Sequence, residues 1–202
     1  MNTIPRFIQH IYFGRTAAFA YAFGVLVLLA LQRGLSQVIL VPLALQFLLL
    51  PQMFYWDVRR AHDPRAVGLQ QLRLDALLLG IWFAEFGFPH WAGFGLLLST
   101  SLNGIVIRGI RGLGASLILF AAGALGWGVA TGFRYEPAVS ATVMHLSVAG
   151  SLIYAWFVGY VVFYNSRLLG AARREVRDSE RRYRLIAENA GDLVAMVNAA
   201  GQ

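Results

Sequence analysis

VSATVMHLSVAGSLIYAWFVGYVVFY, residues 139–164, is a stretch of 26 residues without aspartate, glutamate, lysine or arginine. As an α-helix it would be about 39 Å long at 1.5 Å per residue, whereas the hydrocarbon core of a bilayer is about 30 Å thick. Uncharged apolar stretches of this length are typical of transmembrane helices. We therefore predict that residues 139–164 cross a membrane.

Five further apolar stretches precede this one. They cover residues 16–32, 38–56, 74–88, 92–107 and 113–131. Several of the breaks between them carry turn residues, such as Gly34, Pro89 and Pro137. We therefore predict an all-α membrane protein, with residues 1–164 forming a six-transmembrane-helix bundle.

The composition agrees with this class. Of the 202 residues, 58% are hydrophobic and 13% are charged, whereas soluble domains have roughly 45–50% apolar and about 25% charged residues. This composition excludes an ordinary soluble domain and a disordered chain. Because the chain has no cysteine, disulfides and thiolate metal sites are also excluded.

The arginines predict the topology. All seventeen basic residues are arginines, the net charge is +7, and only Arg33 and Arg134 fall on one of the two sides of the predicted bundle. Because basic residues accumulate in cytoplasmic loops, we expect both termini in the cytoplasm. The arginines form no basic stripe with interleaved aromatic residues, so we expect no nucleic-acid partner.

Polar residues within or beside the predicted spans are candidate signalling residues, because ionisable groups in a bilayer are costly. Asp75 is expected either to pair with an arginine such as Arg73 or Arg108, or to act as a polar latch. Glu85 is expected either to reach the outer membrane surface or to sense protons or a ligand. Asn103 is expected to form a hydrogen bond across helices.

The loop before the third apolar stretch predicts a helix start. Asp63 suits the N-cap position, and Pro64 suits the first helical position, where no N–H is needed. The candidate polar signalling residues are Asp63, Arg73, Asp75, Glu85, Asn103 and Arg108.

Small residues recur every four positions along the sixth apolar stretch, where another helix could approach closely. They are Ser147, Ser151, Ala155 and Gly159. Two interpretations stay open from the sequence: this face packs within the bundle, or it forms a homodimer interface.

We identify no catalytic, cofactor-binding or metal-binding residues. The sequence has no nucleophile with a neighbouring base and no glycine loop that would hold a phosphate. We therefore expect that this chain is not an enzyme and has no cofactor, while an unidentified ligand stays open.

The composition changes after residue 164, where arginine, glutamate and aspartate become frequent. Within residues 165–187, one side of the predicted linker helix repeats with heptad spacing: Leu169, Ala172, Val176, Ser179, Tyr183 and Ile186. This pattern favours a parallel dimeric signalling helix. The alternative is a single amphipathic helix that lies on the membrane.

Three motifs carry a family resemblance: AHDP at residues 61–64, LRLDA at 72–76 and GIW at 80–82, with NG at 103–104 before an Arg/Gly-rich turn at 108–114. Together they resemble the bacterial membrane-associated sensor domain family of the second type. The resemblance covers roughly residues 5–165 and implies a six-span input module of the inner membrane. The chain departs from the family pattern at Gly68 and Gln71.

The sequence at residues 180–192 is ERRYRLIAENAGD, and LVAMVN follows at 193–198. Residues 183–202 resemble the opening of a PAS domain, with a leader helix and then a first strand at residues 192–198. Because the stretch is too short for a whole PAS domain, we expect the chain to be the N-terminal part of a longer signalling protein.

These resemblances imply a sensory input module in the lipid bilayer. From the heptad pattern and the small-residue face we expect dimerisation as well, with a homodimer formed through residues 139–164 and the linker helix. The resemblances further imply a downstream diguanylate cyclase, which would make cyclic di-GMP and be regulated through the PAS domain. The alternatives are the input module of a sensor histidine kinase, a small membrane transporter, or a domain that only anchors and dimerises.

Overall fold

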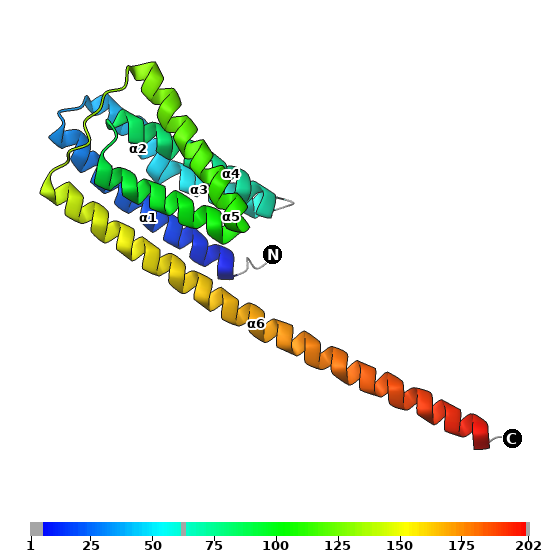
Figure 1. Ribbon diagram of the computed structural model, residues 1–202. Coiled ribbons are helices and arrows are strands. Elements are labelled where there is room, and N and C mark those ends of the chain that lie inside the picture. The colour runs from blue at the N-terminus through cyan, green and yellow to red at the C-terminus, as the bar shows by residue number, and fades with distance from the viewer. Residues whose placement is uncertain (1–5, 62–63, 201–202) are drawn as a thin grey trace. The chain divides into compact units, whose positions relative to one another are not determined.

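The computed structural model describes residues 6–61 and 64–200. Within these residues all regular structure is helical. In chain order the elements are α1 (Arg6–Gln32), η1 (Gln37–Ile39), α2 (Leu40–Ala44), η2 (Leu45–Leu49), α3 (Leu50–Arg60), α4 (Pro64–Glu85), α5 (His90–Thr131) and α6 (Ala141–Ala200) (Figure 1). The chain forms two compact units, residues 1–159 and 160–202, and α6 contributes to both.

The second apolar stretch is a helix with an internal change of winding. Its five-residue segment η2 is a π-helical turn that ends two residues before Pro51. Proline cannot donate a backbone hydrogen bond, and its ring collides with the carbonyl four residues earlier, so wider winding relieves the conflict. Gln46 is buried in this turn, and its Oε1 accepts a hydrogen bond of 2.6 Å from Nε1 of Trp82.

α5 is a hairpin of two helical arms. Gly109 interrupts the helical backbone with φ of 62° and ψ of −146°. A Cβ added to Gly104 would lie 2.8 Å from the hydroxyl of Ser116, although twelve helical residues would span about 18 Å in a straight helix. The chain therefore reverses at Gly109, and both arms can be followed in Figure 1.

Glycine is required at this reversal, because side-chain-bearing residues are strongly disfavoured at these backbone angles. We expect Gly109→Ala to lower the free energy of unfolding by about 1–3 kcal/mol, measured by thermal unfolding in detergent. Gly114→Ala is the matched control, since an added methyl group there meets nothing within 4 Å. An equal loss in both variants would contradict the argument.

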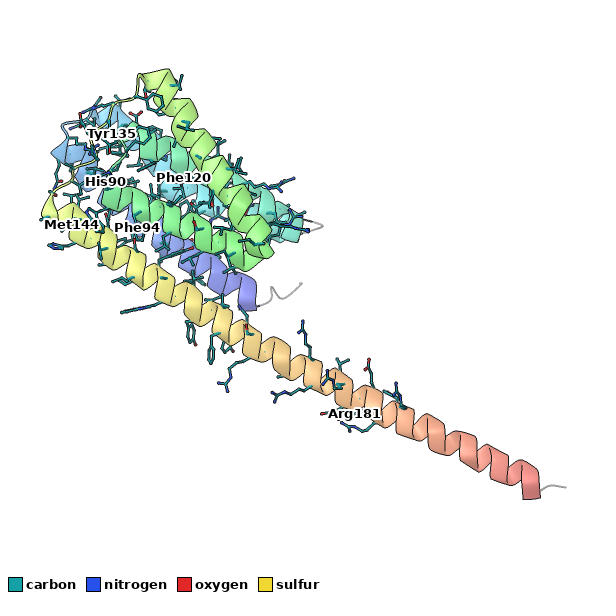
Figure 2. The ribbon with its side chains drawn as sticks, in the orientation of Figure 1. His90, Phe94, Phe120, Tyr135, Met144 and Arg181 are labelled. Carbon is teal, nitrogen blue, oxygen red and sulfur yellow. The ribbon has the colours of Figure 1, made fainter. Side chains whose placement is uncertain are left out.

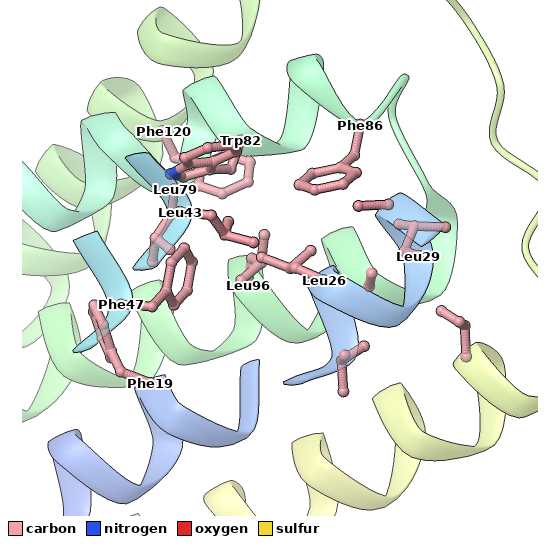
Figure 3. Packing of buried hydrophobic residues seen from close by; sticks show 14 residues of the cluster. Phe19, Leu26, Leu29, Leu43, Phe47, Leu79, Trp82, Phe86, Leu96 and Phe120 are labelled. Carbon is pink, nitrogen blue, oxygen red and sulfur yellow. The ribbon is translucent and has the colours of Figure 1, made fainter. Parts of the chain in front are cut away.

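Glycines also allow α4 and α5 to pack closely. A Cβ at Gly80 would overlap the carbonyl oxygen of Phe120, and one at Gly123 would overlap that of Leu77. Around this contact the buried core joins α1, the second apolar stretch, α4, both arms of α5 and, through Val143, the first turn of α6 (Figure 3). Phe47 and Phe86 are among its fully buried side chains.

α6 is attached differently. Within residues 141–159 its backbone makes few close approaches to other helices. Large side chains bridge the gap instead: the ring of Phe157 faces Gly14, and the ring of Tyr21 faces Gly150. The Tyr21 hydroxyl donates a hydrogen bond of 2.8 Å to the carbonyl of Leu146. The backbone of α6 is thus held less tightly than that of α4 or α5.

The prediction of an all-helical, multi-pass membrane protein is confirmed. Among the described residues, the stretches long and apolar enough to cross a membrane are Tyr12–Gln32, Gln37–Arg60, His90–Thr131 and Ala141–Leu168. α4 falls outside this set because polar residues such as Arg73 and Asp75 lower its hydropathy. The six apolar stretches lie almost entirely on helix.

The predicted PAS strand at residues 192–198 is wrong for this structure, because α6 stays helical through Ala200. A lone strand leaves its backbone N–H and C=O groups unpaired, and no strand exists within residues 6–61 and 64–200 to pair with it. A helix satisfies these groups within the segment itself.

Candidate functional site

A cavity of about 530 Å³ lies among α1, α4, the first arm of α5 and residues 147–157 of α6. Its volume falls within the roughly 300–1,000 Å³ that is typical of small-molecule sites. Most of its wall is apolar, with contributions from Leu26, Leu79, Leu96 and Phe157. Figure 3 shows the three leucines in the adjoining core.

An ion pair joins two helices at this cavity. Nη2 of Arg15, on α1, donates to Oδ2 of Asp75, on α4. The guanidinium also lies over the rings of Phe19 and Phe54, at 5.5 and 5.0 Å from their centroids. Asp75 is only 5% exposed, so the pair is largely shielded from water.

The partner of Asp75 differs from the two arginines expected from the sequence. Arg73 and Arg108 are both exposed, and the carboxylate pairs with Arg15 instead. Arg73 lies on the same helix but only two residues away, and positions two apart do not face each other on a helix. Arg108 lies beside the α5 reversal at Gly109.

Three buried polar atoms of residues that line the cavity have no hydrogen-bond partner. They are Asp75 Oδ1, Arg15 Nε and Ser147 Oγ, and all three residues line the cavity. Buried polar atoms without a partner are costly, and each calls for an explanation such as a water molecule or a ligand.

A hydrogen bond connects α6 to α5 beside the same cavity. The Tyr154 hydroxyl donates to Oδ1 of Asn103 at 2.7 Å, and both residues line the cavity. Asn103 and Tyr154 each lie 13 residues from the start of their helix, which is about 20 Å along the axis. This contact is therefore nearer to the reversal at Gly109 than to the start of α5.

Part of the chain is similar to a known protein family. Residues 10–98 match the MASE2 domain. MASE2 is a membrane-associated sensory input domain and not a catalytic one. The predicted resemblance is therefore confirmed over these residues, although the match ends earlier than the expected residue 165. No curated protein and no solved structure matches the chain.

The MASE2 match covers only part of the cavity wall. It includes both members of the ion pair, Arg15 and Asp75, whereas Asn103, Ser147 and Tyr154 lie beyond it. The cavity is thus completed by the part of α5 that lies beyond the match and by α6.

The opposite end of the bundle is fastened by Arg33, which follows α1. Its guanidinium donates to the backbone carbonyls of Phe86 and Glu136, and to that of Ala138 at 3.1 Å. Burial lowers the pKa of this guanidinium. Arg134 donates a hydrogen bond to Glu136 and holds the pKa of that carboxyl below its usual range.

We expect Arg33→Met to lower the free energy of unfolding by about 1–2 kcal/mol, since three carbonyls lose a charged donor. Amide hydrogen exchange should also become faster in residues 132–140. Arg134→Met is the control, because it removes only an exposed ion pair, which is worth about 0–1 kcal/mol. Equal acceleration of exchange in both variants would argue against a special role for Arg33.

Glu85 lies at this same end. Its Oε2 accepts a hydrogen bond of 2.6 Å from Nε1 of Trp127, on the second arm of α5. Nearby, the Tyr135 hydroxyl and Nε2 of His90 are 3.3 Å apart, and both residues are labelled in Figure 2. Glu85 therefore belongs to the group of hydrogen-bonded side chains at the Arg33 end of the bundle, and it does not line the cavity.

The structure separates the predicted site residues into groups. Asp75 and Asn103 both line the cavity. Glu85 lies at the end of the bundle that holds Arg33, and Arg73 and Arg108 are exposed. Asp63 lies outside the described residues, while Pro64 begins α4.

The predicted packing face also divides along its length. Ser147 and Ser151 are buried, and a Cβ on Gly95 of α5 would lie 2.9 Å from the Ser151 hydroxyl. Ala155 is half-buried, and Gly159 is exposed. The serines therefore face the interior of their own bundle.

Arg15 and Tyr154 were not predicted as site residues. Arg15 was counted only as a topology signal, although its position inside the apolar segment Tyr12–Gln32 marks it as an intramembrane charge. Tyr154 carries no comparable sequence signal. Within the described part of the chain, no cluster of three or more His, Asp or Glu side chains could hold a metal ion.

Proposed function

We propose that this chain is a six-crossing sensory input module of a bacterial inner-membrane signalling protein, with both termini in the cytoplasm. The observation that carries the proposal is the cavity, which is bordered by the MASE2 match and by α6, the helix that continues to Ala200. A change at the cavity would thereby reach the part of the chain that follows the membrane helices.

Six crossings agree with the helix lengths. α4 has 22 residues, or about 33 Å, enough for a bilayer of about 30 Å. α5 has 42 residues, or about 63 Å, which is twice that thickness, and its reversal at Gly109 divides it into two arms of suitable length. Reporter fusions after residues 61, 109 and 165 should all report the cytoplasm; a periplasmic signal after residue 165 would overturn this topology.

The signal would pass through α6. Its backbone is held less tightly than those of α4 and α5, so a shift of α6 disturbs fewer contacts. In our proposal, altered packing along Ser147, Ser151, Ala155 and Gly159 changes the pairing of two linker helices in a homodimer. Val176 and Tyr183, on the proposed dimer seam, are 59% and 72% exposed. In the proposed homodimer, the linker helix of the second copy would cover these side chains.

The dimer can be tested by cysteine crosslinking, because the chain has no native cysteine. We expect Val176→Cys and Tyr183→Cys to form disulfide-linked dimers in membranes, because the heptad pattern places both on the seam. Arg174→Cys is the control and should crosslink weakly, since it lies on the opposite face of the helix. Equal crosslinking at all three positions would contradict a defined seam.

The proposed output is a diguanylate cyclase regulated through a PAS domain, and this part rests on the resemblance of residues 183–202. The alternative output is a sensor histidine kinase with the same linker. In the full-length protein, a GGDEF-type motif would support the cyclase, and a phospho-acceptor histidine box would support the kinase.

A further inference from the structure

We infer that the cavity accommodates one acyl chain of a bilayer phospholipid, which enters from the membrane between α1 and α6. This inference deepens the proposed sensory function and, as a statement about the stimulus, rests on it: the sensed property is the chain composition of the surrounding bilayer. The binding itself can be measured without any signalling output.

The wall of the cavity is largely a hydrocarbon surface. The hydroxyl groups of its lining residues donate to oxygen atoms of the protein itself; they belong to Tyr21, Ser99, Thr100, Ser151 and Tyr154. The three polar atoms without a partner, in Arg15, Asp75 and Ser147, are buried and are not open to an occupant. The body of an occupant therefore needs no hydrogen-bonding groups.

The cavity opens sideways between α1 and α6. On α1, the lining residues Phe13, Ala17 and Tyr21 are spaced four apart and are exposed, Phe13 to 66%. On α6, the lining residue Ile153 is 60% exposed. All four lie in the parts of these helices that are long and apolar enough to cross a membrane. The opening therefore faces the hydrocarbon core of the bilayer, which consists of acyl chains.

The backbones of α1 and α6 do not close this opening. They make few close approaches to each other, and the contact is made by the rings of Tyr21 and Phe157, which reach Gly150 and Gly14. A side chain can change its rotamer without any separation of two helices. A flexible acyl chain can therefore pass between them.

A hydrocarbon chain is the occupant that this space favours. A buried water molecule needs about two to four polar partners, and an empty space leaves its lining atoms without dispersion contacts. Apolar protein cavities of about 150 Å³ bind benzene, and this cavity has about 530 Å³. The charged headgroup stays outside, because Arg15 and Asp75, the charged residues of the wall, already neutralise each other.

Photolabelling tests the inference on the whole 202-residue chain in nanodiscs of phosphatidylethanolamine and phosphatidylglycerol. The probe is a phosphatidylcholine with a diazirine in the middle of one acyl chain, and mass spectrometry maps the labelled residues. We expect labels on Leu26, Leu79 and Leu96, which line the cavity and are otherwise buried (Figure 3). Labels confined to exposed apolar side chains such as Ile118 would overturn the inference.

A second probe separates the two sources of an acyl chain. It is a free fatty acid with the diazirine at the same depth along its chain. The phospholipid probe should label the three leucines whether or not the fatty acid is present. Labelling of these leucines by the fatty acid alone would overturn the assignment to a bilayer phospholipid.

Two matched variants test the entry route. Ala17 is exposed at the opening, whereas Ala121 is exposed on the second arm of α5, which contributes no residue to the wall. We expect Ala17→Trp to reduce labelling of the three leucines severalfold and Ala121→Trp to leave it unchanged. Because both alanines are exposed, neither substitution requires the core to repack. Equal labelling of the two variants would overturn the entry between α1 and α6.

The same pair of variants separates the binding site from the signal. If the acyl chain is the stimulus, Ala17→Trp should change the yield of crosslinking through Val176→Cys, and Ala121→Trp should not. Labelling as expected with equal crosslinking yields would overturn the chain as the stimulus and leave the site standing. Labelling as expected without crosslinking at Val176 in any variant would instead overturn the proposed dimeric signalling.

Discussion

Arg15→Met is expected to lower the free energy of unfolding by about 3 kcal/mol or more, because it leaves the Asp75 carboxylate unpaired in a site that is only 5% exposed. The two groups come from α1 and α4, so the loss also weakens the contact between these helices. Unfolding in detergent micelles, followed by circular dichroism, measures the effect.

The double variant Arg15→Met/Asp75→Leu should recover most of that loss, because two apolar side chains need no compensation for buried charge. Arg73→Met is the control: the side chain is exposed, and such substitutions usually change stability by less than about 0.5 kcal/mol. Asp75→Leu alone completes the comparison. If the double variant loses as much stability as Arg15→Met and Asp75→Leu combined, the two side chains are not energetically coupled.

Gly80→Ala is expected to produce the second large effect. The added methyl group would overlap the backbone carbonyl of Phe120, so α4 and α5 would have to separate. Overpacking in a core typically costs about 1–3 kcal/mol and occasionally more, and we expect the upper end because backbone atoms have no alternative rotamer. Thermal unfolding in detergent provides the measurement.

Gly126→Ala on α5 is the matched control, since an added methyl group there meets nothing within 4 Å. It should raise stability by about 0.5–1 kcal/mol, because alanine is the better helix former. The two glycine substitutions should therefore have opposite signs. A similar small change in both would mean that α4 and α5 are not held at close distance by Gly80.

The local structure could be predicted well from the sequence, because each feature depends on neighbouring residues. The apolar stretches lie on helices, Pro64 begins α4, and the Arg/Gly-rich segment 108–114 contains the reversal at Gly109. The strand expected at residues 192–198 was the exception. A strand depends on partners elsewhere in the chain, and the described residues supply none.

The candidate site could be predicted only in part. Asp75 and Asn103 were identified as intramembrane polar residues, and both line the cavity. Their partners, Arg15 and Tyr154, were not identified, because they lie 60 and 51 positions away along the chain. Helical periodicity indicates which residues share one face of a helix, but it does not indicate which other helix covers that face.

The sequence alone therefore determined a helical membrane protein, because hydrophobicity, charge and turn residues act locally. Its motifs also indicated the resemblance to a sensor domain. The tertiary structure decided which polar groups meet: Arg15 with Asp75, and Tyr154 with Asn103. It also decided that a cavity lies between these pairs. The physical reason is that a cavity is space left between several helices, and the size of that space depends on how closely their backbones approach one another.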